Sequence, residues 1–374
     1  LYMEKALLAA IATLVGTTIG AGILALPYAF AKAGLIPGVL QLVLVGIAVL
    51  FVNLSLGEVI LRTKEKHQLP GYAEKYLGKW GKFLLLVSCF VFIYGALTAY
   101  VIGEGEVLSF VFLNTTDFRI FFALGFFIVM AFFLYSGLEA LEKGELIGLF
   151  VIMAMIFIIF LFFLPKIDLR NFSFFAKEKF LWFFPYGIVM FAFLAFSALP
   201  EMREELYTHE KLFKHAIVIG TLIPLILYFL FSFAVYGFAG KKTPEIATIA
   251  LGKLPCILAI FTMFSAFFAL GIALKEIFVY DLKLKHIIAF LLVVLPVFFL
   301  AFSIMLFGLV TFSKILSFVG SISGGIGGIL IVLMAKRAKL FGNRKPEYSL
   351  PLNLPIVLIL IILFVLGIAY QFFF

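Results

Sequence analysis

The sequence predicts an all-α integral membrane protein with eleven transmembrane helices. Hydrophobic residues make up 65% of its 374 residues and charged residues only 13%, and the mean hydropathy is +1.22. Phenylalanine alone occurs 50 times, which is more than a single aqueous core can bury. Because this composition lies outside the range of soluble globular domains, the chain is suited to a lipid bilayer.

Apolar runs long enough to cross a bilayer alternate with short segments rich in charged residues, Pro or Gly. A spanning helix needs about 20 mostly apolar residues, because the helix rises about 1.5 Å per residue through a hydrocarbon core of about 30 Å. Eleven runs meet this requirement. They are residues 5–33, 36–61, 81–112, 118–136, 144–164, 181–201, 213–239, 254–280, 286–308, 311–335 and 352–373.

The formal net charge of +9 comes from 29 Lys and Arg against 20 Asp and Glu. Most of the basic residues fall in loops that alternate to one side of the membrane. This distribution predicts a multi-pass protein of the cell membrane with a cytoplasmic N-terminus. The charge therefore reflects membrane insertion, and it forms no basic face for nucleic acid.

The spans lack the residue types that a metal or catalytic centre requires. The four histidines lie in polar stretches, and Cys89 and Cys256 stand isolated in apolar runs, as packing thiols do. A membrane-embedded enzyme would need clustered acids or a His/Asp set inside a span, and a channel would need a charge ring or a filter-like loop. The sequence therefore predicts neither an enzyme nor a channel, and it predicts no cofactor beyond a coupling ion.

The helices divide into two halves of similar length and one extra helix, within a single transporter domain that covers residues 1–374. Residues 5–164 hold five helices, residues 181–335 hold the next five, and residues 352–373 hold the last. Because five is odd, the second half enters the membrane from the opposite side, which gives an inverted five-helix repeat. The first helix of each half is interrupted at a corresponding place, and such interruptions indicate a binding site near the midplane.

The first interruption is the run from Gly16 to Gly22, which holds three glycines in the middle of the span. Each Gly costs about 1 kcal/mol relative to Ala in a helix interior, so we expect this run to unwind. Unwinding frees amides that attract a carboxylate and carbonyls that attract an ammonium group or Na⁺, and these ends match a zwitterion. The alternative is close helix packing, since Gly16 and Gly20 have the spacing of small-residue contacts.

The second interruption lies in the sixth span, between Phe191 and Glu201. Pro200 lacks a backbone donor and clashes with the preceding turn, so we expect a break near Ala195 to Ser197. The alternative is an ordinary span that ends at Pro200.

Four segments carry a family resemblance. GTTIGAGILALPYAFAKAG (16–34) resembles the first helix of the amino acid/auxin permease family (the amino acid transporter transmembrane family) and of the related bacterial aromatic amino-acid permeases, within the amino acid-polyamine-organocation superfamily. FAFLAFSALPEMREEL (191–206) is similar to that family's sixth helix, YGALTAYVIGEGEVL (94–108) to its third and ILSFVGSISGG (315–325) to its tenth. The resemblance implies the fold of the bacterial leucine transporter, with helices 1 and 6 interrupted and an eleventh helix appended. It also implies secondary active transport of an amino acid.

The resemblance further implies roles for individual residues. The amides of Ala21 and Gly22 hold the substrate carboxylate, and the carbonyl of Thr18 and the residues around Ala195 hold its amine. We also expect Gly22→Val to abolish substrate binding with little effect on expression, because the added side chain would block the amides. The side-chain pocket and its lid would be formed by Phe193, Phe196, Ser197 and Tyr100, although the phenol of Tyr100 is also explained as a packing residue.

A cation site is suggested by two hydroxyls on the eighth span. Thr262 and Ser265 lie one helical turn apart and share a face. With the carbonyls of Gly16 and Ile19 they resemble a sodium site between helices one and eight, and the alternative is that both hydroxyls bond back to their own helix. Ala266 stands where sodium-coupled relatives of this fold often carry a second hydroxyl, so the coupling ion, H⁺ or Na⁺, stays open.

The predicted substrate is a neutral amino acid. The midplane segments 16–27, 94–103, 191–199 and 259–270 contain no Asp, Glu, Lys, Arg or His, whereas a charged substrate side chain would need a buried counter-charge. An aromatic substrate is also allowed, because six rings lie in or near these segments: Phe191, Phe193, Phe196, Tyr94, Tyr100 and Phe264. Glu104 and Glu106, just beyond, are either a proton acceptor or a solvated rim. A non-transporting amino-acid sensor of the same fold is the alternative function.

Overall fold

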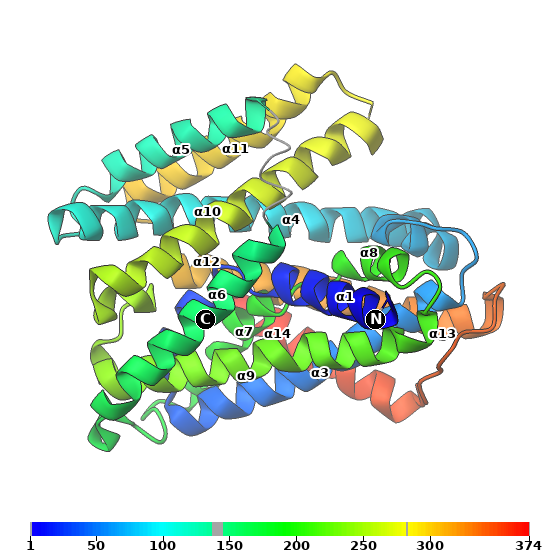
Figure 1. Cartoon of the computed structure of the whole chain (residues 1–374), viewed down its shortest axis with the longest axis horizontal. Helices are drawn as coiled ribbons and strands as arrows, with labels where there is room; N and C mark the ends of the chain where they lie inside the picture. The colour runs from blue at the N-terminus through cyan, green and yellow to red at the C-terminus, as the bar shows by residue number, and fades with distance from the viewer. Residues whose placement is uncertain (1, 137–144, 282, 374) are drawn as a thin grey trace.

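The computed structural model describes residues 2–136, 145–281 and 283–373, and the regular elements in these ranges are all helical (Figure 1). Helices suit a bilayer, because each satisfies its own backbone hydrogen bonds where no water is available. The main helices are α1 (Tyr2–Thr18), α2 (Gly22–Ala33), α3 (Leu35–Leu61), α4 (Leu69–Leu113), α5 (Arg119–Ser136), α6 (Glu145–Phe163), α7 (Pro185–Ala192), α8 (Ala198–Glu205), α9 (Phe213–Ala239), α10 (Lys253–Glu276), α11 (His286–Phe307), α12 (Phe312–Val319), α13 (Gly325–Phe341) and α14 (Leu354–Phe373).

Eleven spans are predicted; the described residues contain nine helices that are long and apolar enough to cross a membrane, or ten when the bent pair α1 and α2 is counted as one span. The expected span at 181–201 is divided into α7 and α8, each of eight residues. A helix of this length reaches only about 12 Å, so neither piece crosses a bilayer alone.

The third predicted span begins earlier in the structure than expected. The span predicted at 81–112 is the later part of α4, a helix of 45 residues that starts at Leu69 and bends at Gly78. Gly78 has φ 76°, a conformation that costs a glycine little. The start of the predicted span at residue 144 lies outside the described residues.

The interrupted helices occupy the centre of the molecule. Every residue of α7 is buried, and most of α2 is buried as well. By contrast, α5, α11 and α14 carry many exposed large apolar side chains, as expected of helices that face lipid. In Figure 1, α5 and α11 lie together at one edge, while α1 and α7 lie in the middle.

A glycine contact holds α7 against the segment between α12 and α13. This segment, Gly320–Gly324, is a short π-helix. A Cβ placed on Gly320 would come 2.0 Å from the carbonyl oxygen of Gly187 in α7, and a Cβ on Gly187 would come 2.3 Å from the carbonyl oxygen of Ser317. Only glycine allows the two backbones to approach this closely, which fixes the position of α7.

Candidate functional site

The first break separates α1 from α2. The two helices are bent by 57° around residues 19–21. The amide of Gly20 donates to the carbonyl of Thr18 (3.0 Å), so the carbonyl of Gly16 loses the donor that a continuous helix would supply. The break lies within the predicted run but is narrower, because Gly16 is still part of α1.

The second break separates α7 from α8. The chain leaves the helix after Ala192 and re-enters it at Ala198, so residues 193–197 are the break. Pro200 does not cause it as expected, since this proline lies in the first turn of α8, where a missing amide hydrogen costs little. The alternative of a continuous span that ends at Pro200 is wrong.

The two breaks meet in space. A Cβ added to Gly22, at the start of α2, would lie 2.7 Å from the Cα of Ala192, at the end of α7. The phenol of Tyr228, on α9, donates to the carbonyls of both Thr18 and Ala192, at 2.7 Å each. Its ring packs edge-on against the ring of Phe193, with the centroids 5.3 Å apart. Tyr228 therefore joins the last turns of α1 and α7.

Tyr228 is a site residue that the sequence pattern does not predict. It lies in the apolar run of α9, where a buried tyrosine is usually explained by packing. The signal was a polar hydroxyl in the middle of a predicted span, which must find a buried partner. The identity of that partner depends on how distant helices meet.

The helix ends around the breaks present partial charges of both signs. The carbonyl ends of α1 and α7 carry partial negative charge, and the amide ends of α2 and α8 carry partial positive charge. The residues that precede these last two helices, Ala21 and Ser197, make no side-chain capping bond. At α8 the amides of Ala198 and Leu199 already donate to the carbonyls of Ala195 and Phe196. At α2 the amide of Gly22 has no backbone acceptor among the described residues, so this end is the one that can bind a carboxylate.

The residues predicted to bind substrate lie in different environments. Thr18 is buried, and its hydroxyl donates to the carbonyl of Leu14, so only its own carbonyl faces the break. Ser197 is exposed, although the rest of the second break is buried. The other predicted residues are all buried: Ala21, Gly22, Tyr100, Phe193, Ala195 and Phe196.

The structure gives a reason to revise the prediction for Gly22→Val. The side chain of residue 22 would point at the backbone of Ala192. We therefore expect the substitution to disrupt the packing of α2 against α7 and to lower expression as well, because backbone atoms cannot move aside cheaply.

Tyr100 and α10 approach the first break from the other side. A Cβ on Gly20 would lie 3.8 Å from the Tyr100 hydroxyl and 3.9 Å from the Cβ of Ala266. The structure thus brings the third predicted span to the break, where the sequence placed Tyr100.

Of the six rings predicted near the site, two have contacts at the junction of the breaks: Phe193 packs on Tyr228, and the Tyr100 hydroxyl lies near Gly20. The other four rings have different partners. Phe191 packs on Phe92 and Phe264 on Phe133, the Tyr94 hydroxyl donates to the carbonyl of Leu292, and Phe196 lies against Gly327.

The predicted cation ligands are less well gathered. The hydroxyls of Thr262 and Ser265, which we call the α10 hydroxyl pair, donate to carbonyls of their own helix, as the alternative interpretation expected. Gly16 is exposed, and a Cβ there would face Leu149 of α6. Ile19 is buried at the break. Oxygen-only ligands suit a hard cation such as Na⁺, and the hydroxyl lone pairs remain available for it.

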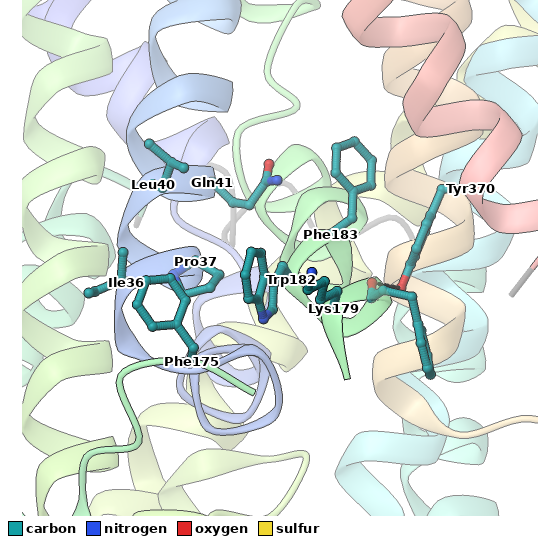
Figure 2. A pocket seen from close by; sticks show the side chains of 10 residues that line it. Ile36, Pro37, Leu40, Gln41, Phe175, Lys179, Trp182, Phe183 and Tyr370 are labelled. Carbon is teal, nitrogen blue, oxygen red and sulfur yellow. Dashed lines mark hydrogen bonds between the residues drawn. The ribbon is translucent and has the colours of Figure 1, made fainter. Parts of the chain in front are cut away.

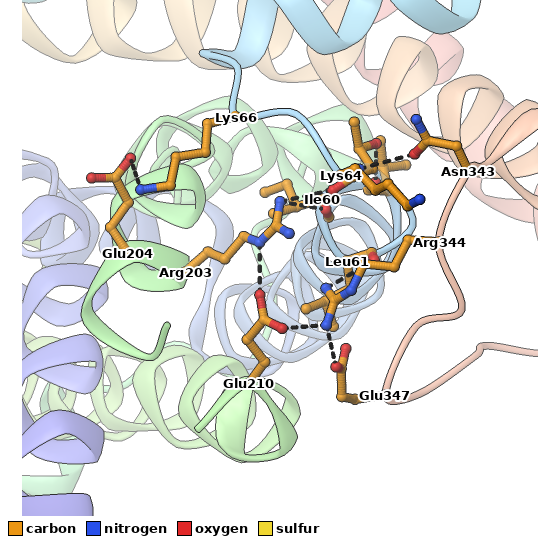
Figure 3. Close-up of polar contacts among 12 residues, drawn as sticks. Ile60, Leu61, Lys64, Lys66, Arg203, Glu204, Glu210, Asn343, Arg344 and Glu347 are labelled. Atoms are coloured by element: carbon orange, nitrogen blue, oxygen red, sulfur yellow. Dashed lines mark hydrogen bonds and ion pairs between the residues drawn. The ribbon is translucent and has the colours of Figure 1, made fainter. Parts of the chain in front are cut away.

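A polar network ties together one end of the helices, away from the breaks (Figure 3). Arg203 of α8 donates to the carbonyls of Ile60 and Thr63 and pairs with Glu210 at 2.9 Å. Arg344, from the segment between α13 and α14, pairs with the same Glu210. The segment that precedes α14 is thus bound to the C-terminal ends of α3 and α8.

The loop that follows α3 belongs to the same end of the molecule. Asn343 accepts from the amide of Lys64 and donates to Glu65. The hydrogen bond that Lys75 donates holds the pKa of Glu65 at about 2. This carboxylate therefore stays ionised at neutral pH.

A surface cavity of about 420 Å³ lies apart from the breaks (Figure 2). It is bounded by the start of α3, the segment 175–183 and the end of α14. None of the predicted site residues lines it. Its walls are mainly aromatic and aliphatic, with Gln41 and Lys179 as the polar members.

Spanning helices, two of them broken around a common centre, are typical of membrane transporters of small molecules. The chain belongs to the tryptophan/tyrosine permease family, whose family model matches residues 3–371.

Three curated relatives are similar over 59% of this chain. Glutamine transporter 2 of Aliivibrio fischeri is 24% identical over 227 residues, tyrosine-specific transport system 1 of Haemophilus influenzae is 26% identical over 224, and tyrosine-specific transport system 2 of the same organism is 30% identical over 243. The matches cover 58%, 55% and 56% of these relatives, so the chain spans little more than half of their length.

Proposed function

We propose that this protein is a secondary active transporter that moves a neutral, aromatic amino acid across the cell membrane by alternating access. The family membership supports transport, and two of the three relatives named above are tyrosine-specific transport systems. The observation that carries the proposal is the junction at Tyr228, where the carbonyl ends of two broken helices meet.

The proposed architecture is that of the bacterial leucine transporter. Residues 5–164 and 181–335 form inverted five-helix repeats, residues 352–373 add an eleventh helix, and the N-terminus is cytoplasmic. The split of the first helix of each half supports this arrangement, because a paired interruption is typical of such repeats.

In the proposed site, backbone groups bind the amino-acid part of the substrate. The amides of Ala21 and Gly22, at the positive end of α2, bind the carboxylate. The carbonyls of Thr18 and Ala192 bind the ammonium group. The Tyr228 hydroxyl has one proton for these two carbonyls, and the Thr18 carbonyl also accepts the Gly20 amide, so a substrate ammonium would add a hydrogen bond chiefly at the Ala192 carbonyl.

The substrate side chain would lie among Tyr100, Phe193, Ala195, Phe196 and Ser197. This proposed lining has no charged group, so a charged substrate side chain would be left unpaired at a cost of several kcal/mol, of the order expected for a buried charge. Aromatic rings give a large apolar contact with a ring of the substrate, and a hydroxyl can orient a phenol or indole.

The proposed driving ion is H⁺ or Na⁺. For Na⁺, the ligands would be the carbonyls of Gly16 and Ile19 and the α10 hydroxyl pair. The carbonyl of Gly16 lacks the amide donor of a continuous helix, which supports this set. The hydroxyls of the α10 pair already bond within their own helix, which weighs against it.

The test is uptake into proteoliposomes of labelled tyrosine, tryptophan, phenylalanine, glutamine, alanine, arginine and aspartate, with pH and Na⁺ gradients imposed separately. We expect tyrosine or tryptophan to be taken up best and arginine and aspartate to compete poorly. Preferential displacement by a charged amino acid would contradict the proposed pocket. Tight binding with no uptake under any gradient would instead identify a sensor.

A further inference from the structure

Glu104 is a carboxyl group in the interior of α4. It lies four residues after Tyr100, so the two side chains share one face of the helix, and Tyr100 reaches the first break at Gly20. The site described above uses Tyr100 but gives no role to Glu104.

Burial of Glu104 is complete, and its two carboxyl oxygens have no hydrogen-bond partner among the described residues. Glu58, which is equally buried, shows how a structural carboxylate is held in the same protein. Its oxygens accept hydrogen bonds from Arg62, from Ser349 and from the amide of Leu350, each at 2.8 Å. Glu104 therefore lacks the partners that keep a buried carboxylate ionised.

The glycines on both sides of Glu104 press α4 against its neighbours. A Cβ on Gly103 would lie 2.7 Å from the sulfur of Met263 in α10, and a Cβ on Gly105 would lie 2.5 Å from the carbonyl oxygen of Arg119 in α5. These close contacts keep lipid and bulk water away from this part of α4, so the carboxyl group is enclosed by protein.

The charged groups of the surrounding helices do not neutralise Glu104. Arg119 pairs with Glu106 at 3.4 Å, and the nearby Glu245 carboxylate accepts the amide of Ser313 at 2.8 Å. Five described helices that pack on α4 carry other charged or titratable side chains, and all of these lie at or near helix ends. They are Lys253, Cys256, Lys275 and Glu276 of α10, Tyr135 of α5, His286 of α11, Lys314 of α12, and Lys336, Arg337 and Lys339 of α13.

We propose that Glu104 binds the proton whose movement drives substrate transport. Because an ionised, unpaired carboxylate is strongly disfavoured in such surroundings, the group carries a proton in this conformation. When the site opens to one solution the carboxylate takes up one proton, and when the site opens to the other it releases that proton. Because Glu104 shares a helix face with Tyr100, which reaches Gly20, this proton exchange is coupled to the first break. The inference rests on the proposed transport function and assigns its driving ion.

The experiment compares wild type with Glu104→Gln and with Glu106→Gln in proteoliposomes, using labelled tyrosine. The second variant is the matched control, because Glu106 lies on the same helix two residues away but has a cationic partner. Two quantities are measured: tyrosine–tyrosine exchange without any gradient, and accumulation driven by a pH gradient with the membrane potential clamped.

We expect wild type and Glu106→Gln to show both activities. Glu104→Gln should continue to exchange tyrosine but should accumulate no more of it under a pH gradient than without one, because glutamine cannot bind and release a proton. Accumulation by Glu104→Gln equal to that of wild type would overturn the inference, and so would wild-type accumulation that responds only to Na⁺. Wild type that exchanges none of the amino acids tested would instead refute the proposed function.

A second measurement covers a Glu104→Gln protein that fails to exchange. Tyrosine affinity is measured against pH in detergent, for wild type and for Glu104→Asp. If Glu104 carries the proton, wild-type affinity falls as the pH rises, and the aspartate shifts the pH at which it falls. Affinity that is independent of pH in wild type, or an unshifted profile in Glu104→Asp, would overturn the inference.

Discussion

Removal of the Tyr228 hydroxyl tests the junction between the two breaks. Tyr228→Phe keeps the ring that packs on Phe193 and deletes only the donor to the carbonyls of Thr18 and Ala192. Both acceptors are buried at helix ends. The Thr18 carbonyl keeps the amide of Gly20 as a donor, whereas the Ala192 carbonyl has no other donor among the described residues. The substitution therefore leaves the Ala192 carbonyl unsatisfied without creating a large cavity.

The expected cost follows from the number of bonds lost. One hydroxyl proton serves two carbonyls, so we count one full hydrogen bond and one weaker one. An unsatisfied buried acceptor costs about 1–3 kcal/mol, and hydrogen bonds inside a membrane protein average about 0.6 kcal/mol. We therefore expect the free energy of unfolding to fall by about 1–2 kcal/mol, which changes the ratio of folded to unfolded protein by about 5- to 30-fold.

Tyr186→Phe is the matched control. Tyr186 is as deeply buried as Tyr228, but its hydroxyl has no hydrogen-bond partner among the described residues. Its removal should be neutral or slightly stabilising, because no bond is lost and a buried polar atom is eliminated.

The assay is reversible unfolding of the purified protein in mixed detergent micelles, followed by tyrosine uptake. Tyr228→Phe should unfold at lower denaturant than wild type and should change the KM for tyrosine, whereas Tyr186→Phe should do neither. Equal stability of the two variants would show that the hydroxyl of Tyr228 does not join the breaks.

Three further substitutions test other parts of the structure. Gly22→Ala should cost about 1–3 kcal/mol by overpacking against α7 and lower the yield of folded protein, whereas Gly125→Ala, which meets no atom within 4 Å, should not. Arg203→Ala should lower the free energy of unfolding by about 1–3 kcal/mol, because it removes one of the two cationic partners of Glu210 and the side-chain donor to the carbonyls of Ile60 and Thr63, and Lys66→Ala, in an exposed ion pair, by less than about 1 kcal/mol. If tyrosine binding depends on Na⁺, replacement of the α10 hydroxyl pair by Ala should raise the Na⁺ concentration needed for half-maximal binding, whereas wild-type binding that never depends on Na⁺ would make the pair structural.

Local features explain which parts of the site could be predicted. The break near Gly20 follows from a cluster of glycines within one span, and this effect depends only on neighbouring residues. The cause of the second break, between α7 and α8, could not be predicted as well. Pro200 was expected to terminate a helix, but a proline in the first turn begins one, and the sequence alone does not distinguish the two positions.

Glu104 shows the same limit. Its position near a helix end allowed both a solvated rim and a buried proton acceptor. The rim interpretation is wrong for Glu104, because its side chain is fully buried. That outcome depends on the contacts of its flanking glycines with α5 and α10, which come from distant parts of the chain.

The sequence by itself determined that the chain is suited to a lipid bilayer, approximately where its helices lie and where the first break occurs. These features depend on hydropathy and helix propensity, which act over short stretches of chain. Only the tertiary structure decided which groups meet at the centre. Tyr228 is 210 residues from Thr18 and 36 residues from Ala192, yet one phenol bonds both. Such a junction depends on how helices pack against one another, and packing is a property of the assembled fold.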